Sequence, residues 1–136
     1  MLALRDPREA YRRVEVDARV QGASQGELVV VCMDEVVMAL GSAMLADARG
    51  NNTLKSRSLT RAISALFALE MGVQADNPMA GVLLQLFQSA RHTVLASVAA
   101  FEPERIRDIR ADFREVGQAF RIAFTQAHAR PSLKPI

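Results

Sequence analysis

The fold is decided by residues 24–52, whose sequence is SQGELVVVCMDEVVMALGSAMLADARGNN. Ser24 and Glu27 have the spacing of a capping box, in which each side chain satisfies an otherwise unpaired backbone N–H at the start of a helix. Gly50 is expected to end that helix, because glycine adopts the left-handed conformation that residues with a β-carbon resist. The pattern predicts one long helix over about residues 25–49.

Helical patterns lie on both sides of this stretch. Apolar residues three and four positions apart, beginning with Leu59 and Ala62, predict a helix over about residues 54–71. Pro78 and Pro103 each follow a residue that proline pushes out of helical geometry, and proline itself favours the first position of a helix. They predict helices over about residues 78–100 and 103–127, and Asp6-Pro7 predicts a short one over about residues 7–18.

Size and composition fit a single helical domain. Half of the 136 residues are apolar, only 5% are aromatic, and there is no Trp. Long helices joined by a few residues must run antiparallel to their neighbours. We therefore predict an all-α, antiparallel four-helix bundle with a short N-terminal helix or cap segment. One domain should span residues 1–128, with a mobile C-terminal tail over residues 129–136.

Several classes of protein do not fit the sequence. The longest uninterrupted apolar run stops at Asp34, well short of the roughly 20 residues of a spanning helix, so membrane insertion is not expected. The N-terminus reaches charge and proline too early for a secretion signal, which favours the cytosol. A net charge of +2 without a basic stripe does not indicate nucleic-acid binding. Cys32 is the sole cysteine, so no internal disulfide can form.

The predicted helix over residues 25–49 is apolar around most of its circumference, and the next two helices carry apolar residues outside their main stripe. An outer helix of a bundle would leave part of such a surface in water, and exposed apolar patches usually mark interaction sites. The predicted partner-binding residues in these helices are Leu28, Val29, Cys32, Met33, Val36, Val37, Leu40, Phe67, Met71, Leu84, Phe87 and Leu95. Alternatively, the short N-terminal helix or a homodimer contact covers these surfaces.

No motif indicates catalysis, a metal or a cofactor, and we predict that the chain is not an enzyme. Asp34 and Glu35 point in diverging directions on a helix and are expected on a solvated face. His92 leaves one alternative open, a histidine phosphotransfer domain. That family usually has Lys and Gly three and four residues after its His, where this chain has Leu95 and Ala96.

The motifs along the chain resemble those of the FliS family of flagellar secretion chaperones. Ala10-Tyr11 is similar to the family's N-terminal Ala-Tyr, and residues 23–29 (ASQGELV) are similar to its Ala-Ser-Pro-x-Glu-Leu-Ile. Residues 59–69 and 79–87 resemble the patterns of its second and third long helices. The chain departs from the family at Gln25, which stands in place of Pro, at residues 32–35 (CMDE) and at residues 76–78 (DNP).

The resemblance implies an export chaperone that binds the disordered C-terminal segment of flagellin in apolar grooves, prevents premature polymerisation and delivers the client to the flagellar type III export apparatus. The cytosolic domain of the export gate is then a further expected partner. By motif match, Tyr11, aided by Val14, covers an apolar groove when no client is present. A homodimeric structural or regulatory bundle is the alternative.

Overall fold

The structure, a computed structural model, describes residues 25–129, which form four helices with no strand among them. The helices are α2 (Gln25–Ala48), α3 (Asn52–Gly72), α4 (Ala80–Ala99) and α5 (Pro103–Ala129). The predicted all-α four-helix bundle is confirmed, and each helix end lies within one turn of its expected place. The predicted helix over residues 7–18 and residues 130–136 of the predicted tail lie outside the described residues, whereas Ala129 ends α5.

The turn between α2 and α3 follows the expected chemistry. Gly50 has a φ of +70°, the left-handed conformation that ends α2. The side-chain Oδ1 of Asn51 then accepts a hydrogen bond from the backbone N of Leu54 at 3.0 Å. Because Asn51 caps the helix in this way, α3 begins at Asn52, earlier than the apolar pattern alone indicates.

The turn before α4 differs from the expectation for Pro78. The Oδ1 of Asn77 accepts a hydrogen bond from the backbone N of Met79 at 2.7 Å, which holds Pro78 in a turn. The helix therefore starts at Ala80 and not at the proline. Pro103, by contrast, is the first residue of α5, as expected.

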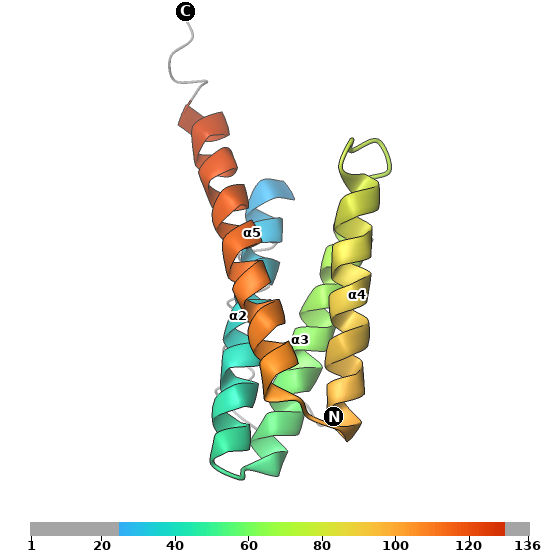
Figure 1. The fold of residues 1–136 in the computed structure, drawn as a ribbon. Helices are drawn as coiled ribbons and strands as arrows, with labels where there is room; N and C mark the ends of the chain where they lie inside the picture. The colour runs from blue at the N-terminus through green and yellow to red at the C-terminus, as the bar shows by residue number, and fades with distance from the viewer. Residues whose placement is uncertain (1–24, 130–136) are drawn as a thin grey trace, which may run out of the picture.

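Three of the four pairs of neighbouring helices pack closely, whereas α4 and α5 make few contacts with each other. Figure 1 shows the loops α2–α3 and α4–α5 at one end of the bundle and the loop α3–α4 at the other, together with the start of α2 and the end of α5. Helix α2 packs extensively against α3 and α5, and α3 also packs against α4. Helices α4 and α5 contact each other far less, and they diverge from the loop that joins them (Figure 1).

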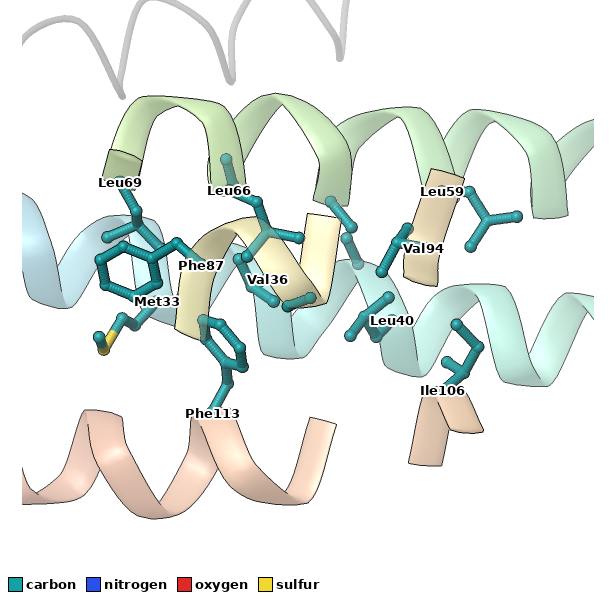
Figure 2. Close-up of a cluster of buried hydrophobic side chains, with 14 of the residues drawn as sticks. Met33, Val36, Leu40, Leu59, Leu66, Leu69, Phe87, Val94, Ile106 and Phe113 are labelled. Carbon is teal, nitrogen blue, oxygen red and sulfur yellow. The ribbon is translucent and has the colours of Figure 1, made fainter. Parts of the chain in front are cut away.

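The core is built from one stripe of each helix, as Figure 2 shows. The rings of Phe87 and Phe113 meet with centroids 6.0 Å apart and planes tilted by 39°, and this contact links α4 to α5. At the end opposite the start of α2, Lys55 lies 5.0 Å from the centroid of the Phe101 ring and forms an ion pair with Asp47 at 2.9 Å. That end of the bundle is closed by these contacts.

Helix α2 is the most apolar of the four helices, and it lies between α3 and α5. Among residues 25–129, its segment Gly26–Ala48 is the one helix long and apolar enough to cross a membrane by length and composition. Val36, Ala39 and Leu40 on this helix are completely buried between its neighbours. Packing in the bundle therefore buries part of this apolar run, whereas Met38 and Leu45 remain 62% and 52% exposed.

The two adjacent acids of α2 form ion pairs with different neighbouring helices. Arg61 of α3 donates to Glu35 at 3.0 Å, and Arg121 of α5 donates to both carboxylate oxygens of Asp34 at 2.8 Å. The expected divergence of Asp34 and Glu35 is found. The side chain of Asp34 is 48% exposed, whereas that of Glu35 is largely covered, and both acids form ion pairs. Each acid points towards a different neighbouring helix and pairs with its arginine.

Candidate functional site

An apolar groove of about 340 Å³ opens at the end of the bundle where α2 begins and α5 ends. We call it the apical groove. Its walls come from all four helices and from the loop between α3 and α4. The lining residues are Leu28, Val29, Cys32, Ala68, Leu69, Gly72, Val73, Gln74, Asn77, Leu83, Phe87 and Phe120.

The helical period explains how α2 and α4 build this groove. Leu28 and Cys32 are four residues apart, as are Leu83 and Phe87, so each pair lies on one face of its helix. Leu28, Cys32 and Leu83 are partly exposed, whereas Phe87 is only 2% exposed and forms part of the floor. The groove thus has an apolar lining that water still reaches.

The thiol of Cys32 behaves as part of that apolar lining. Burial raises its pKa above the ordinary value for cysteine, and the nearby carboxylate of Glu35 raises the pKa further. Both effects favour the neutral thiol over the thiolate, which is the nucleophilic form. Cys32 is therefore suited to apolar packing and poorly suited to nucleophilic chemistry at neutral pH.

The predicted partner-binding residues fall into separate regions of the structure. Leu28, Val29, Cys32 and Phe87 come together at the apical groove. Met33, Val36 and Leu40 lie in the core and are at most 1% exposed, so they are not available at the surface in this arrangement (Figure 2). Their burial follows from the position of α2 between α3 and α5, which the helical period of α2 alone does not reveal.

A second group of predicted residues lies on the outer surface of α3 and α4. Phe67, Met71 and Leu95 are 52%, 73% and 53% exposed, and Leu84 is partly exposed. Arg91 of α4 lies 5.8 Å from the centroid of the Phe67 ring and forms a two-pronged ion pair with Glu70 of α3. That pairing raises the pKa of Arg91, and it joins the two helices beneath the exposed apolar side chains.

Val37 belongs to neither region. It is partly buried between α2 and α5, and its carbonyl oxygen accepts a hydrogen bond from Nε of Arg110 at 3.1 Å. Its side chain lines a wide depression of about 600 Å³ together with charged residues that include Arg114 and Arg121. Tyr11 and Val14 lie outside the described residues.

A second groove was not predicted from the sequence. It has a volume of about 350 Å³ and lies between α4 and α5, and we call it the lateral groove. The lining residues are Val82, Gln85, Leu86, Ser89, Ala90, Ile109, Asp112 and Phe113. The helical period of α4 and α5 cannot show that the interface between them stays open.

Chemical sites of other kinds are not visible in the described part of the chain. Within residues 25–129, no group of three or more His, Cys, Asp or Glu side chains is placed to hold a metal ion. His92, on which the phosphotransfer alternative rests, is exposed on α4. In this part of the chain, the apical and lateral grooves are the candidate binding sites.

The fold and these grooves define a class of protein, an all-α four-helix bundle with apolar grooves on its surface. Comparison with protein families matches residues 7–127 to the family described as "Flagellar protein FliS". The chain belongs to the FliS family, a family of flagellar chaperones whose partner is flagellin. A comparison with curated proteins gave no match.

Proposed function

We propose that this chain is a cytosolic export chaperone that binds the disordered C-terminal segment of flagellin, and that the apical groove is the principal binding site. The observation that carries the proposal is the groove itself: a pocket of about 340 Å³ with a mainly apolar lining, built by helices that have a full core beneath it. Bound client could not use the same apolar residues for filament assembly. The chaperone would deliver it to the type III export apparatus, where the cytosolic domain of the export gate is the proposed second partner.

The physical basis is the match between an amphipathic segment and a preformed apolar surface. A disordered segment loses conformational entropy when it becomes ordered on binding, and burial of its apolar side chains must offset that loss. Burial contributes about 25 cal/mol per Å² of apolar area. The groove supplies partly exposed apolar side chains for this purpose, among them Leu28, Val29 and Leu83.

We propose that Tyr11 and Val14 cover the apical groove when no client is bound. Leu28 lines the groove in the first turn of α2, so the preceding chain joins α2 at the rim of the groove. The N-terminal segment and the client then compete for one surface. Tyr11→Ala should raise client affinity or increase self-association. Unchanged affinity together with an unchanged oligomeric state would contradict this competition.

The main experiment compares two substitutions on α2. Leu28→Glu places a charge in the apical groove, and Leu45→Glu makes the same change at a residue that is 52% exposed near the other end of α2. In titrations with a flagellin C-terminal peptide, Leu28→Glu should weaken binding by a factor of ten or more, since burial of an unpaired charge is costly. Leu45→Glu should bind normally. Equal binding by both variants would remove the apical groove from the proposal.

Cys32 gives an independent readout of the same site. Its raised pKa predicts that alkylation by iodoacetamide is slow at neutral pH and accelerates only at a pH above that needed for an exposed cysteine. The flagellin peptide should slow the reaction further by covering the groove. An alkylation rate that stays the same at saturating peptide would place the client elsewhere.

The exposed outer surface of α3 and α4 supports a second candidate, a homodimeric structural or regulatory bundle. Phe67, Met71 and Leu95 are the residues that such a contact would cover. Light scattering over a range of concentrations distinguishes the two. A stable dimer that Phe67→Arg converts to a monomer without loss of client binding would assign this surface to self-association.

A further inference from the structure

The outward side of α2 carries two exposed apolar side chains that belong to neither groove. Met38 and Leu45 are both more than half exposed. They are seven residues apart, so they lie two turns apart on one face of the helix. Gly41 lies between them on the same face, and the Arg110 side chain of α5 closely approaches it. This face of α2 therefore borders α5 and is open to water.

Two contacts fix the register of α5 against this face. Arg121 donates to both carboxylate oxygens of Asp34 at 2.8 Å, and Nε of Arg110 donates to the Val37 carbonyl oxygen at 3.1 Å. Residue numbers that rise along α2 are thus matched by falling numbers along α5, and the two helices run antiparallel. The register predicts which α5 side chains lie beside Met38 and Leu45.

The neighbours on the α5 side are arginines without an ion-pair partner. Arg107, Arg114 and Arg121 recur every seven residues and therefore share one face of α5. In the register above, Arg114 lies at the level of Met38 and Arg107 at the level of Leu45. Both arginines are exposed, and neither forms an ion pair among the described residues.

Further arginines lie on the α3 side and at the end of α2. Arg61 of α3 donates to Glu35 at 3.0 Å, so the face of α3 that carries Arg61 is turned towards α2. Arg57 lies four residues earlier on that face, and Arg49 lies one turn beyond Leu45. Both are exposed and, within residues 25–129, have no ion pair. We define the outer α2 face as Met38, Leu45, Arg49, Arg57, Arg107 and Arg114.

The acids of α2 do not neutralise these arginines. Asp34 and Glu35 are paired with other arginines, and Asp47 is paired with Lys55. Glu27 lies in the first turn of α2, three turns away from Met38. The acids on the helix that carries the two apolar side chains are therefore either paired or distant.

The acids of α5 lie on another face of that helix. Each is exposed, and their spacings of four and three residues place them on one face: Glu104, Asp108, Asp112 and Glu115. Glu115 follows Arg114 directly, but adjacent residues of a helix point about 100° apart. Arg105 is directed away from α2 and pairs with Glu102. The outer α2 face is thus apolar in the middle and positively charged at its edges.

We propose that the outer α2 face binds a helix of a second protein whose apolar residues recur every seven positions between rows of aspartate or glutamate. The apolar residues would pack on Met38 and Leu45, with carboxylates facing Arg107 and Arg114 on one edge and Arg57 on the other. Because the apolar pair and the arginine pair have the same seven-residue spacing, they match the period of a helix laid along α2. A lipid surface needs no such register. This inference goes beyond the proposed function, since the face lines neither groove.

The test uses two synthetic helical peptides of five turns, about 18 residues each. Both carry the same leucine stripe, flanked by glutamates in one peptide and by lysines at the same positions in the other. At low ionic strength the glutamate peptide should bind the full chain about tenfold more tightly, because each of three exposed charge pairs contributes a factor of about two. The ratio should fall as salt is added, since screening weakens exposed pairs. Equal affinities would overturn the inference.

Charge reversal on α5 locates the binding site. Arg114→Glu should lower the ratio of the two affinities about fourfold, because it removes one attraction and adds one repulsion. Arg105→Glu changes the net charge of the chain by the same amount on another face of α5, and it should lower the ratio far less. An equal fall in both variants would mean that only net charge matters, and it would overturn the site.

Charge at the apolar centre tests the rest of the face. Met38→Glu should weaken the glutamate peptide by a factor of about ten or more, since it removes an apolar contact and adds a like charge. Met71→Glu makes the same change at a methionine of α3 that is even more exposed, and it should have little effect. Both positions are exposed, so circular dichroism should show that both variants keep the fold. Equal affinities of the two variants would overturn the inference.

Leu45→Glu separates this inference from the proposed function. The variant should bind the flagellin peptide normally and the glutamate peptide at least severalfold more weakly. Undiminished binding of the glutamate peptide would overturn only the outer α2 face, whereas failure of the unaltered chain to bind flagellin would overturn only the proposed function. Two other occupants are tested directly, with vesicles of phosphatidylcholine and phosphatidylglycerol and with light scattering of the chain alone. Vesicle binding or self-association that Arg114→Glu abolishes would overturn the proposed partner.

Discussion

The two flanks of α5 are built differently. Towards α2, the flank is closed by Arg121 on Asp34, by Arg110 on the Val37 carbonyl oxygen, and by two glycines that permit close approach. Towards α4, the main contact is the ring of Phe113 against Phe87, and a groove of about 350 Å³ remains open beside it. A helix of one amphipathic pattern can thus have one completed interface and one that stays open, depending on the residues that neighbouring helices present.

The glycines show why the α2 flank closes. A β-carbon added at Gly41 would lie 3.1 Å from Nε of Arg110, and one added at Gly117 would lie 3.6 Å from the Met33 β-carbon. Arg110 and Met33 occupy the space that larger side chains would need. The α4 flank has no comparable fit, because Val82 is 61% exposed and Leu86 is only partly buried.

The largest expected effect comes from removing the ring that links the open flank. Phe113→Ala should lower the free energy of unfolding by about 3–5 kcal/mol, as expected for a buried phenylalanine replaced by alanine. Urea unfolding followed by circular dichroism measures the change. A loss below about 1 kcal/mol would mean that the open flank tolerates separation of α4 from α5, and that Phe113 is not a structural link.

Overfilling the closed flank should have the next largest effect. Gly41→Leu forces Arg110 away from α2 and should cost about 1–3 kcal/mol in the free energy of unfolding. Gly81→Leu is the matched control, because a β-carbon at Gly81 has no neighbour within 4 Å. Equal stability of the two variants would show that the close approach at Gly41 does not hold the flank together.

A truncation at the open flank should cost less than the same kind of truncation in the core. Ile109 is partly exposed at the lateral groove, so Ile109→Ala should lower the free energy of unfolding by about 1 kcal/mol, below the 2–5 kcal/mol of fully buried sites. Ile106→Ala, at a residue of α5 that is completely buried, provides the comparison. Similar losses in urea unfolding would mean that the lateral groove is closed in solution.

The smallest effect is expected for the ion pair on the closed flank. Asp34 and Arg121 are about half exposed, and such pairs contribute about 0.2–1 kcal/mol. A double-mutant cycle with Asp34→Ala and Arg121→Ala should therefore give a small coupling free energy that decreases with salt. A coupling above about 2 kcal/mol would assign this pair a main role in closing the flank.

Prediction from sequence succeeded where the chemistry is local. The left-handed stop at Gly50 and the proline at 103 gave helix ends close to those in the structure, whereas Ser24 of the capping pattern lies outside the described residues. The predicted start of α4 at Pro78 was two residues too early, because the Asn77 side chain holds Pro78 in a turn that the sequence pattern did not reveal. For the site, four predicted residues meet in the apical groove, but Met33, Val36 and Leu40 are buried, and the lateral groove was not foreseen.

The sequence by itself determined the helices, their order and the apolar excess of α2, because caps, breakers and the 3.6-residue period act within a few residues along the chain. The tertiary structure alone decided which part of that apolar surface is core and which part is groove. That outcome depends on contacts between residues far apart in the sequence, such as Arg110 against Gly41 and Phe87 against Phe113. A periodic pattern identifies the apolar side of a helix, but the neighbours that arrive there decide whether that side is covered.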